Sequence, residues 1–313
     1  MDICQGERKL GRWLGAYCVL RMEFGAHLPV LSLAGEAHSL ERLTAYARAA
    51  SQLGYTVLSA NDHMVYSRPH LDALTTLAVV IESSGQMKLM TSIALLVIRG
   101  AAPLAKALAA IDVLSDGRMI VGAGPGSSPK DYETVDVAFE ERWRRFDEMV
   151  PKLRQCWADL EPHPIQDAIP IWIGSWGSDA GLRRTARLGD GWLASAYNTT
   201  PAKFAEDWKK LRAHLSDRGR DGHAFPNGIA TMFFHVTEMR AEADEVLTLL
   251  STVLRRPSDE LRDRFLVGPA GECIEKLRAY ANAGVQRMLM WPVRDELRQL
   301  ELFSNRVAAS VVR

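Results

Sequence analysis

Short apolar runs alternate with segments of helical periodicity along most of the chain, from residue 23 to residue 291. Eight of these runs have the length and the apolar character of buried strands. The predicted strands are residues 23–28, 55–59, 88–95, 118–122, 171–173, 191–193, 229–236 and 286–291. Near-continuous apolar runs are typical of parallel strands that are covered on both faces.

The segments between these runs carry apolar residues at the three- and four-residue spacing of amphipathic helices. The clearest stripe is Trp143, Phe146, Val150, Leu153, Trp157 and Leu160. We interpret this stripe as one packed helix face, with charged neighbours turned mostly toward solvent. Gly54 follows another periodic segment and suits the residue just after a helix end.

Strands that alternate with helices fit either a closed barrel or an open, doubly wound sheet. The count of eight favours the barrel, and no linker marks a second domain. We therefore predict an α/β fold, a (β/α)8 TIM barrel that forms a single domain with loop insertions over residues 22–313. Residues 1–21 precede the first strand and are predicted to be an N-terminal extension of doubtful structural role.

The composition is that of a globular chain, with 47% hydrophobic and 24% charged residues among 313, which excludes a coiled coil or a disordered tail. Basic and acidic residues balance at 38 each, so we expect neither nucleic acid nor an anionic membrane as a partner. No apolar run approaches the roughly 20 residues of a membrane span. The cysteines, Cys4, Cys18, Cys156 and Cys273, lie far apart, which favours a reducing cytoplasm over a disulfide framework.

Polar residues follow the second predicted strand, and in a barrel the chemistry lies where strands end. Asn61, Asp62 and His63 stand there. A histidine titrates near neutral pH, and a neighbouring carboxylate can orient it or stabilise its charge. The alternative is an aspartate that caps a helix beside a packed histidine. No H-x-H or H-E-x-x-H spacing occurs, so no metal site is predicted.

Two glycine-bearing loops follow the fourth and fifth strands. The first runs from Gly122 to Lys130 and has three glycines at alternate positions, where backbone amides could approach an anion. The second, residues 174–179, leads into a helix whose N-terminus could bind a phosphate. Neither loop has the spacing of a dinucleotide fingerprint or a Walker loop, and each could be an ordinary turn.

An ordered set of segments carries a family resemblance. The segments are ASQLGY (50–55) with NDH (61–63), AKALAAIDVLSDGR (105–118), GAGPG (122–126), FEERW (139–143), RFDE (145–148), IWIG (171–174) and ARLGDGW (186–192). In this order they resemble the luciferase-like flavin-dependent oxidoreductases, the bacterial luciferase superfamily, over most of residues 22–291. The resemblance implies an eight-stranded barrel.

Members of this family use either reduced FMN with oxygen or the 8-hydroxy-5-deazaflavin coenzyme F420 as a hydride carrier. The resemblance favours F420, with Asp62 and His63 at the ring edge or the substrate, and Ser92 and Ile93 joined by a non-prolyl cis peptide behind the ring. It also implies two groups of coenzyme-binding residues. These are Gly124, Pro125, Gly126 and Ser127 after the fourth strand, and Gly174, Ser175, Trp176, Gly177 and Ser178 after the fifth.

The chain also departs from the family pattern. Residues 161–170 are shorter than the insertion of many members, and no acidic residue stands at positions 28–30. The second departure disfavours a sugar phosphate as substrate.

The leading hypothesis is a cytoplasmic oxidoreductase that transfers a hydride between F420 and a small carbonyl, imine, activated alkene or alcohol. His63 would be the proton donor or acceptor, and Asp62 would orient it. The alternative is an FMN-dependent monooxygenase, which would need a separate flavin reductase. A third reading is a non-catalytic flavin- or deazaflavin-binding relative. The resemblance also implies a homodimer.

Overall fold

The computed structural model describes residues 22–33 and 35–311. The predicted N-terminal extension, residues 1–21, lies outside this part of the chain. The strands of the described residues form one sheet and are β1 (Glu23–His27), β2 (Val57–Ala60), β3 (Lys88–Leu95), β4 (Met119–Gly124), β5 (Ile171–Gly174), β6 (Gly191–Ser195), β7 (Asn227–Thr237), β8 (Leu266–Pro269) and β9 (Arg287–Pro292).

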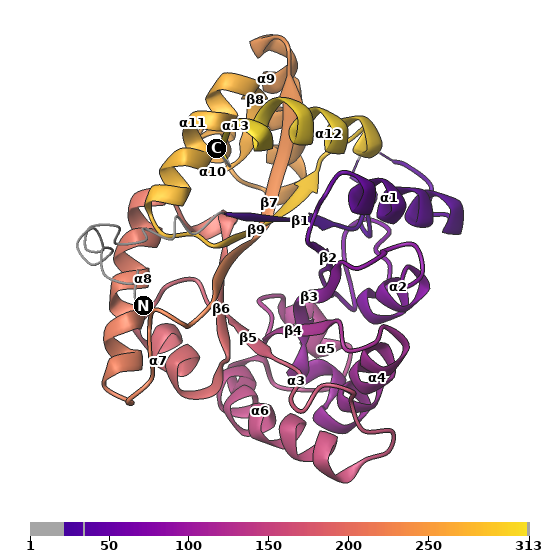
Figure 1. Ribbon diagram of the computed structural model, residues 1–313, viewed down its shortest axis with the longest axis vertical. Coiled ribbons are helices and arrows are strands. Elements are labelled where there is room, and N and C mark those ends of the chain that lie inside the picture. The colour runs from indigo at the N-terminus through magenta and orange to yellow at the C-terminus, as the bar shows by residue number, and fades with distance from the viewer. Residues whose placement is uncertain (1–21, 34, 312–313) are drawn as a thin grey trace, which may run out of the picture.

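All pairings between these strands are parallel, in the order β6-β5-β4-β3-β2-β1-β9-β7-β8. A further pairing joins β6 to β7 and closes eight of the strands into a barrel. Helices surround the strands on the outside (Figure 1). The prediction of a (β/α)8 barrel is confirmed.

One strand was missed in the sequence. β8 pairs only with the last part of β7, from Leu266 opposite Phe234 to Pro269 opposite Thr237, and so lies outside the barrel. It contains only four residues, and its apolar pair Leu266 and Val267 is followed at once by Gly268 and Pro269, both poor strand formers, so the apolar run is too short to predict a strand.

The helices carry the apolar stripes expected from the sequence. In order they are α1 (Leu40–Gln52), α2 (Ala73–Val79), α3 (Leu96–Arg99), α4 (Ala101–Leu114), α5 (Pro129–Glu133), α6 (Arg142–Asp159), α7 (Asp179–Leu188), α8 (Pro201–Ser216), α9 (Arg240–Leu254), α10 (Ser258–Arg264), α11 (Ala270–Asn282), α12 (Glu296–Leu302) and α13 (Ala309–Val311), with short turns of other helix types at η1 (Phe139–Glu141), η2 (Ala196–Asn198) and η3 (Phe303–Ala308). Ser39 caps α1 by accepting a hydrogen bond from the backbone amide of Arg42. Gly54 follows α1 with φ of 82°, the left-handed conformation predicted for it.

Side chains fill the inside of the barrel below its carboxyl end. Seven strands each contribute one residue to this cluster: Val57, Met90, Ile120, Trp172, Leu193, Ala230 and Leu289. β1 contributes Gly25, where a Cβ atom would lie 2.7 Å from Leu289 Cδ2 and 3.0 Å from Val57 Cβ. The glycine is required because the two neighbouring side chains occupy its share of the space. A filled interior leaves the carboxyl ends of the strands as the place for a ligand.

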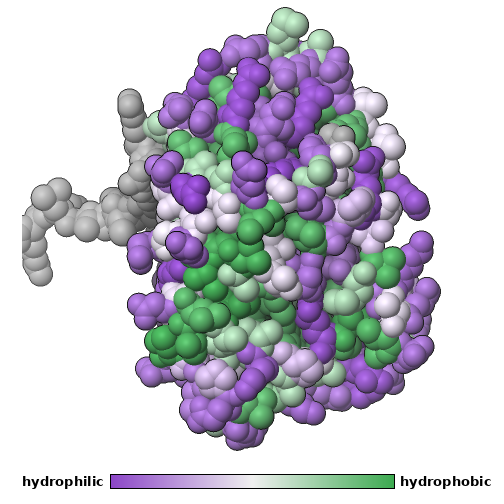
Figure 2. Space-filling view, turned by 90° about the vertical axis from the view of Figure 1, so that its right-hand side faces the viewer, coloured by the Kyte–Doolittle hydropathy of each residue, from purple (hydrophilic) through white to green (hydrophobic). Residues whose placement is uncertain are grey.

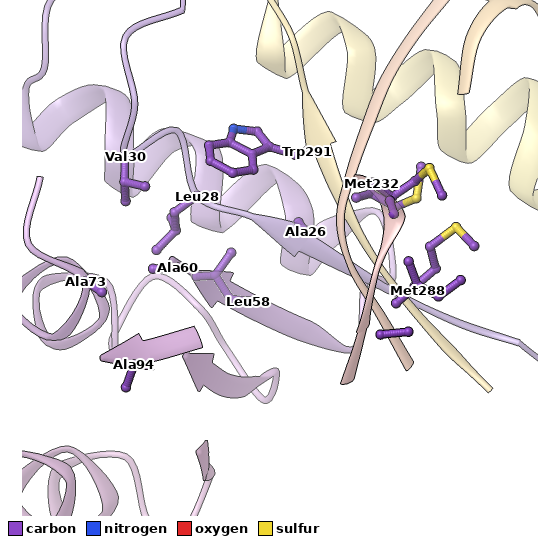
Figure 3. Packing of buried hydrophobic residues seen from close by; sticks show 14 of the residues in the cluster. Ala26, Leu28, Val30, Leu58, Ala60, Ala73, Ala94, Met232, Met288 and Trp291 are labelled. Carbon is purple, nitrogen blue, oxygen red and sulfur yellow. The ribbon is translucent and has the colours of Figure 1, made fainter. Parts of the chain in front are cut away.

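A larger apolar core lies between the outer faces of the strands and the helices. Figure 3 shows part of it, with Leu28, Leu58 and Ala60 near β1 and β2, and Met232 and Met288 on β7 and β9. This core holds the strands in place, so side chains at the strand ends are carried on a rigid support.

The face at the right of Figure 1, where α1, α2 and α4 lie, carries a gathering of apolar residues within a polar surrounding (Figure 2). α2 and α4 pack against each other, and Val79 and Leu114 on them have exposed side chains.

Among the described residues, no helix combines the length and the apolar character that crossing a bilayer requires.

Candidate active site

A cavity of about 430 Å³ opens at the carboxyl ends of the strands. Most of the predicted site residues line it, namely Asp62, His63, Ser92, Ile93, Pro125, Gly126, Ser127, Gly174, Ser175, Trp176 and Ser178. Gly124 and Gly177 do not line it. The barrel therefore brings residues from four different strand ends to one place.

His63 is held by a residue that the sequence did not indicate. Its Nδ1 lies 3.0 Å from Oδ2 of Asp131, and Oδ1 of Asp131 accepts the backbone N–H groups of Met64 and Val65 at 2.9 and 2.8 Å. Burial would raise the pKa of Asp131, but the hydrogen bonds from His63, Val65 and Met64 outweigh it and the pKa is lowered. An ionised Asp131 only accepts, so Nδ1 of His63 carries the proton and its Nε2 is free to act in the cavity.

The prediction that Asp62 orients His63 is wrong. The Asp62 carboxylate instead accepts two hydrogen bonds from Arg99, at 2.6 and 2.7 Å, and one from the backbone N–H of Leu95 at 3.1 Å. Asp62 thus points toward Arg99 of α3, whereas His63 points toward Asp131 of α5. Asp62 still lines the cavity, and its contact with a coenzyme remains a prediction.

The sequence does not single out Asp131, because no local motif distinguishes it. It is an acidic residue in the first turn of α5, a common place for an ordinary helix residue. It stands 68 positions from His63, and only the barrel brings the two together.

A second half-buried histidine, His70, packs against His63. The ring centroids of His63 and His70 lie 5.5 Å apart with the rings nearly perpendicular, and Tyr66 contacts both rings. Nδ1 of His70 lies 2.8 Å from the backbone oxygen of Leu71, and Nε2 lies 3.2 Å from Oδ1 of Asn61. Burial, followed by the charge of His63, lowers the pKa of His70 to about 4. His70 precedes α2, which begins at Ala73.

Ser92 and Ile93 form a shelf at the wall of the cavity. The peptide bond between them is cis, as the family resemblance implied. A Cβ atom on Gly124 would overlap Ile93 Cδ1, and one on Gly174 would lie 3.0 Å from Ile93 Cγ2. These glycines let Ile93 lie flat across two strands. The buried hydroxyl of Ser92 has no partner among the described residues, so the shelf offers both an apolar surface and a polar group to a planar ligand.

Part of the hydrogen-bonding capacity at the N-terminus of α7 is already used within the protein. Ser178 caps the helix by accepting the backbone N–H of Gly181 at 3.2 Å, and the Asp179 carboxylate binds His214 at 2.8 Å. Gly177 has φ of 84°, and a Cβ atom there would collide with the buried carboxylate of Asp207. The positive φ and the nearby carboxylate of Asp207 are thus sufficient reasons for glycine at position 177. Phosphate binding at this loop stays a prediction.

Aromatic side chains surround the cavity. Tyr66, Trp176, Tyr197 and Trp291 line it. Trp143 also lines it and is 37% exposed, which corrects the interpretation of Trp143 as part of the packed face of α6. Trp143 has the helical spacing of the apolar stripe, but it lies in the first turn of α6, which extends past the core.

Two hydroxyl groups on the opposite wall were also missed. Thr231 lies in a bulge of β7 and has φ of 57°, a conformation that is rare for a β-branched residue. Its hydroxyl donates to the backbone oxygen of Ala230 and lies 3.5 Å from the Ser195 hydroxyl. Both residues line the cavity. A backbone conformation of this kind has no signal in the sequence.

Residues 22–257 match the family described as luciferase-like monooxygenase. This match covers more than half of the chain, so the chain belongs to that family. The resemblance stated from the sequence is confirmed.

Three relatives show the range of the family. An uncharacterised protein of Mycobacterium tuberculosis is 29% identical over 170 residues, which cover 49% of this chain and 58% of that protein. The F420-dependent hydroxymycolic acid dehydrogenase of Mycobacterium tuberculosis is 27% identical over 198 residues, which cover 55% of this chain and 54% of the dehydrogenase. The chain thus matches little more than half the length of these two relatives. The 4-hydroxyprotoasukamycin monooxygenase of Streptomyces nodosus subsp. asukaensis is 25% identical over an alignment of 345 residues, which covers 92% of each chain.

Solved structures agree with the barrel. An F420-dependent secondary alcohol dehydrogenase in complex with an F420–acetone adduct superposes with a TM-score of 0.81 at 14% identity, over 93% of this chain and 99% of that chain. The monooxygenase RslO1 from Streptomyces bottropensis superposes with a TM-score of 0.80 at 20% identity, over 92% of this chain and 99% of that chain. At these identities the likeness concerns the fold.

Proposed function

We propose that this protein is an F420-dependent oxidoreductase that transfers a hydride between the coenzyme and a small organic substrate. The observation that carries the proposal is that His63, fixed by Asp131, and the Ile93 shelf face one cavity. The F420-dependent hydroxymycolic acid dehydrogenase among the relatives supports this choice of coenzyme.

The residues of the cavity fit a planar ring. Ile93 would support one face, and the unpartnered Ser92 hydroxyl would bind a polar edge. Gly126 and Ser127 after β4 would border it, together with Ser175 after β5. When bound, a deazaflavin supplies two-electron hydride chemistry.

His63 would exchange a proton with the substrate. Asp131 holds a proton on Nδ1 of His63, so Nε2 is the nitrogen that would accept the proton of a hydroxyl group. The same nitrogen, once protonated, can return the proton to a carbonyl oxygen. The aromatic side chains around the cavity would exclude water from this exchange.

The second candidate is an FMN-dependent monooxygenase supplied with reduced FMN by a separate reductase. The alignment with 4-hydroxyprotoasukamycin monooxygenase favours it because it covers 92% of both chains. We also propose that the protein is a homodimer, as the family resemblance implies, and that it is cytoplasmic, as the widely spaced cysteines favour.

Equilibrium titration of the purified protein with F420, oxidised FMN and anaerobically reduced FMN separates the two candidates. Trp143, Trp176 and Trp291 line the cavity, so tryptophan fluorescence should report binding. We expect micromolar affinity for F420 and much weaker binding of either form of FMN. Selective binding of reduced FMN would favour the monooxygenase, and binding of none would contradict both candidates.

Two variants check that the signal comes from the cavity. Trp176→Phe removes a tryptophan that lines it, whereas Trp208→Phe removes a tryptophan that lies in the core and does not line it. The change on binding should shrink in the first variant and persist in the second.

A further inference from the structure

β7 carries an extra residue at the wall of the cavity. Ala230 and Thr231 together stand opposite a single residue of β9, so the strand forms a bulge there. Ala230 points into the barrel and belongs to the apolar cluster inside it. In a regular strand the next residue would point outward, yet Thr231 also lines the cavity. The bulge therefore turns the side chain of Thr231 inward, toward a ligand.

The hydrogen of the Thr231 hydroxyl is used within the protein. Oγ1 donates to the backbone oxygen of Ala230 at 2.7 Å, and a hydroxyl has only one hydrogen. A second contact, with the Ser195 hydroxyl, is 3.5 Å long, which exceeds a normal O–H···O hydrogen bond. Ser195 stands two positions after the inward-facing Leu193, so both hydroxyls lie on the inner side of the wall. Toward a ligand, Oγ1 of Thr231 can only accept.

The charges around the cavity favour a neutral donor as the partner of Thr231. Among the described residues that line the cavity, Asp62 has the one carboxylate. Both of its oxygens are used within the protein, by Arg99 and by a backbone N–H. An ammonium group would therefore find no free counter-charge, whereas a hydroxyl or an amide N–H needs none.

Thr231 lies across the barrel from the Ile93 shelf. Between β3 and β7 stand β4, β5 and β6 on one side of the barrel and β2, β1 and β9 on the other. A ring that rests on Ile93 therefore turns its second face toward β7. β1 and β9 also separate β7 from β2, which carries His63 at its end, so we expect His63 and Thr231 to contact different parts of a ligand.

We propose that Thr231 is a substrate-binding residue whose Oγ1 accepts a hydrogen bond from a neutral hydroxyl or amide N–H of the substrate. The inference rests on the proposed function, because the coenzyme ring is taken to lie on Ile93 and the substrate on the other face of the ring. The substrate class is a compound with two polar groups. One reacts at His63, and the second is a neutral donor that binds Thr231.

The first test compares two probes, trans-cyclohexane-1,4-diol and its monomethyl ether, by calorimetry. The full chain is loaded with reduced F420, which does not oxidise an alcohol. Each probe has a hydroxyl for His63, but the ether lacks the second donor. We expect the preference for the diol to be about two- to tenfold larger in the wild type than in Thr231→Val, as one hydrogen bond implies. Equal preferences, or binding of neither probe, would overturn the proposal.

Two further variants show whether the hydroxyl itself is responsible. Thr231→Ser keeps the hydroxyl and should keep the preference of the wild type. Thr237→Val is the matched control, because Thr237 is buried on the same strand and does not line the cavity. It should also keep the preference. A loss of the same size in Thr237→Val and in Thr231→Val would show that the effect is structural and would overturn the proposal.

The second test is neutron diffraction from crystals of the full chain in heavy water, which locates exchangeable hydrogens. We expect the deuterium of the Thr231 hydroxyl to lie between Oγ1 and the backbone oxygen of Ala230. A deuterium that points into the cavity would make Thr231 a donor and would overturn the proposal.

A donor on the ring edge of the coenzyme has the same chemistry as a donor on the substrate. Titration of Thr231→Val with F420 separates the two sources, and we expect the affinity of the wild type. A loss of affinity for F420 with an unchanged preference between the probes would assign the hydrogen bond to the coenzyme and overturn the proposal.

Failure of this inference and failure of the proposed function have different signatures, because the probes are also compared on the chain without coenzyme. A chain that binds neither F420 nor FMN, but prefers the diol through Thr231, contradicts the proposed function alone. A chain that binds F420, but shows the same preference in the wild type and in Thr231→Val, contradicts the role of Thr231 alone.

Discussion

Asp131 is buried, and its charge is used entirely within the protein, on His63 and on the backbone of Met64 and Val65. In Asp131→Asn the amide oxygen can still accept the two backbone N–H groups, but its nitrogen then faces Nδ1 of His63. The proton of His63 would move to Nε2, where it blocks the lone pair. We expect turnover to fall about 100-fold or more, the size of a lost general base, with affinity for the coenzyme nearly unchanged. Steady-state kinetics and the fluorescence titration measure the two effects.

The same variant has a pH signature in stability. The pKa of Asp131 is lowered in the folded protein, so its ionised form stabilises the fold above the unfolded pKa of about 4, and this contribution is lost as the pH falls through the folded value. Asp131→Asn should therefore cost about 1–3 kcal/mol at pH 7 and less at pH 3. Asp136→Asn, an exposed change five residues along, should alter neither activity nor stability. An equal loss in Asp131→Asn at both pH values would show that its charge does not matter.

Thr231 has a left-handed backbone conformation, which a β-branched side chain disfavours. A left-handed conformation costs an L-residue roughly 1–2 kcal/mol, whereas glycine adopts it freely. Thr231→Gly should thus leave the melting temperature unchanged or raise it by up to about 2–4 °C, although glycine usually weakens a strand. The control is Thr237→Gly on the same strand, where φ is not positive, and it should lower the melting temperature. A lower value in both variants would show that Thr231 is not strained.

At the scale of elements, β4 carries two glycines that are required for different reasons. A Cβ atom on Gly122 would lie 2.1 Å from the backbone oxygen of Thr91, which cannot move, whereas one on Gly124 meets only the tip of Ile93. Gly122→Ala should therefore prevent stable folding. Gly124→Ala should fold, at a cost of about 1–3 kcal/mol, and push Ile93 toward the cavity. We expect its affinity for F420 to fall about tenfold, measured by the same fluorescence titration.

Gly271 provides the control for this pair. It lies in α11, and no atom stands within 4 Å of an added Cβ. Gly271→Ala should keep full affinity for the coenzyme and equal or higher stability. If Gly124→Ala binds F420 as tightly as Gly271→Ala does, the shelf has no part in holding the ring.

The elements also show how far the sequence could be interpreted. The barrel was predictable because each of its strands is an apolar run followed by a periodic helix. β8 was missed because its apolar run is short and ends at Gly268 and Pro269. The residues at the strand ends were predictable for the same reason, since a barrel gathers them at one face. The partner of His63 was not, because Asp131 approaches it through the fold from a short helix.

At the scale of the whole molecule, closure of the barrel depends on β1, which pairs with β2 on one side and with β9 on the other. The backbone N–H of Glu23 donates to Gln286, its carboxylate binds Arg287, and the next residue, Phe24, packs edge-on against Phe303. A chain that begins at Met22 keeps all of these contacts. We therefore expect it to melt within about 2 °C of the full chain and to bind the coenzyme equally well.

The opposite result would assign residues 1–21 a structural role. A chain that begins at Pro29 is the matched control, because it lacks β1 and leaves β2 and β9 without a common neighbour. It should show no cooperative thermal transition in circular dichroism, since an opened barrel exposes its core and two strand edges. If the chain from Met22 melts many degrees below the full chain, the extension contributes to the stability of the barrel, and the domain boundary at residue 22 is wrong.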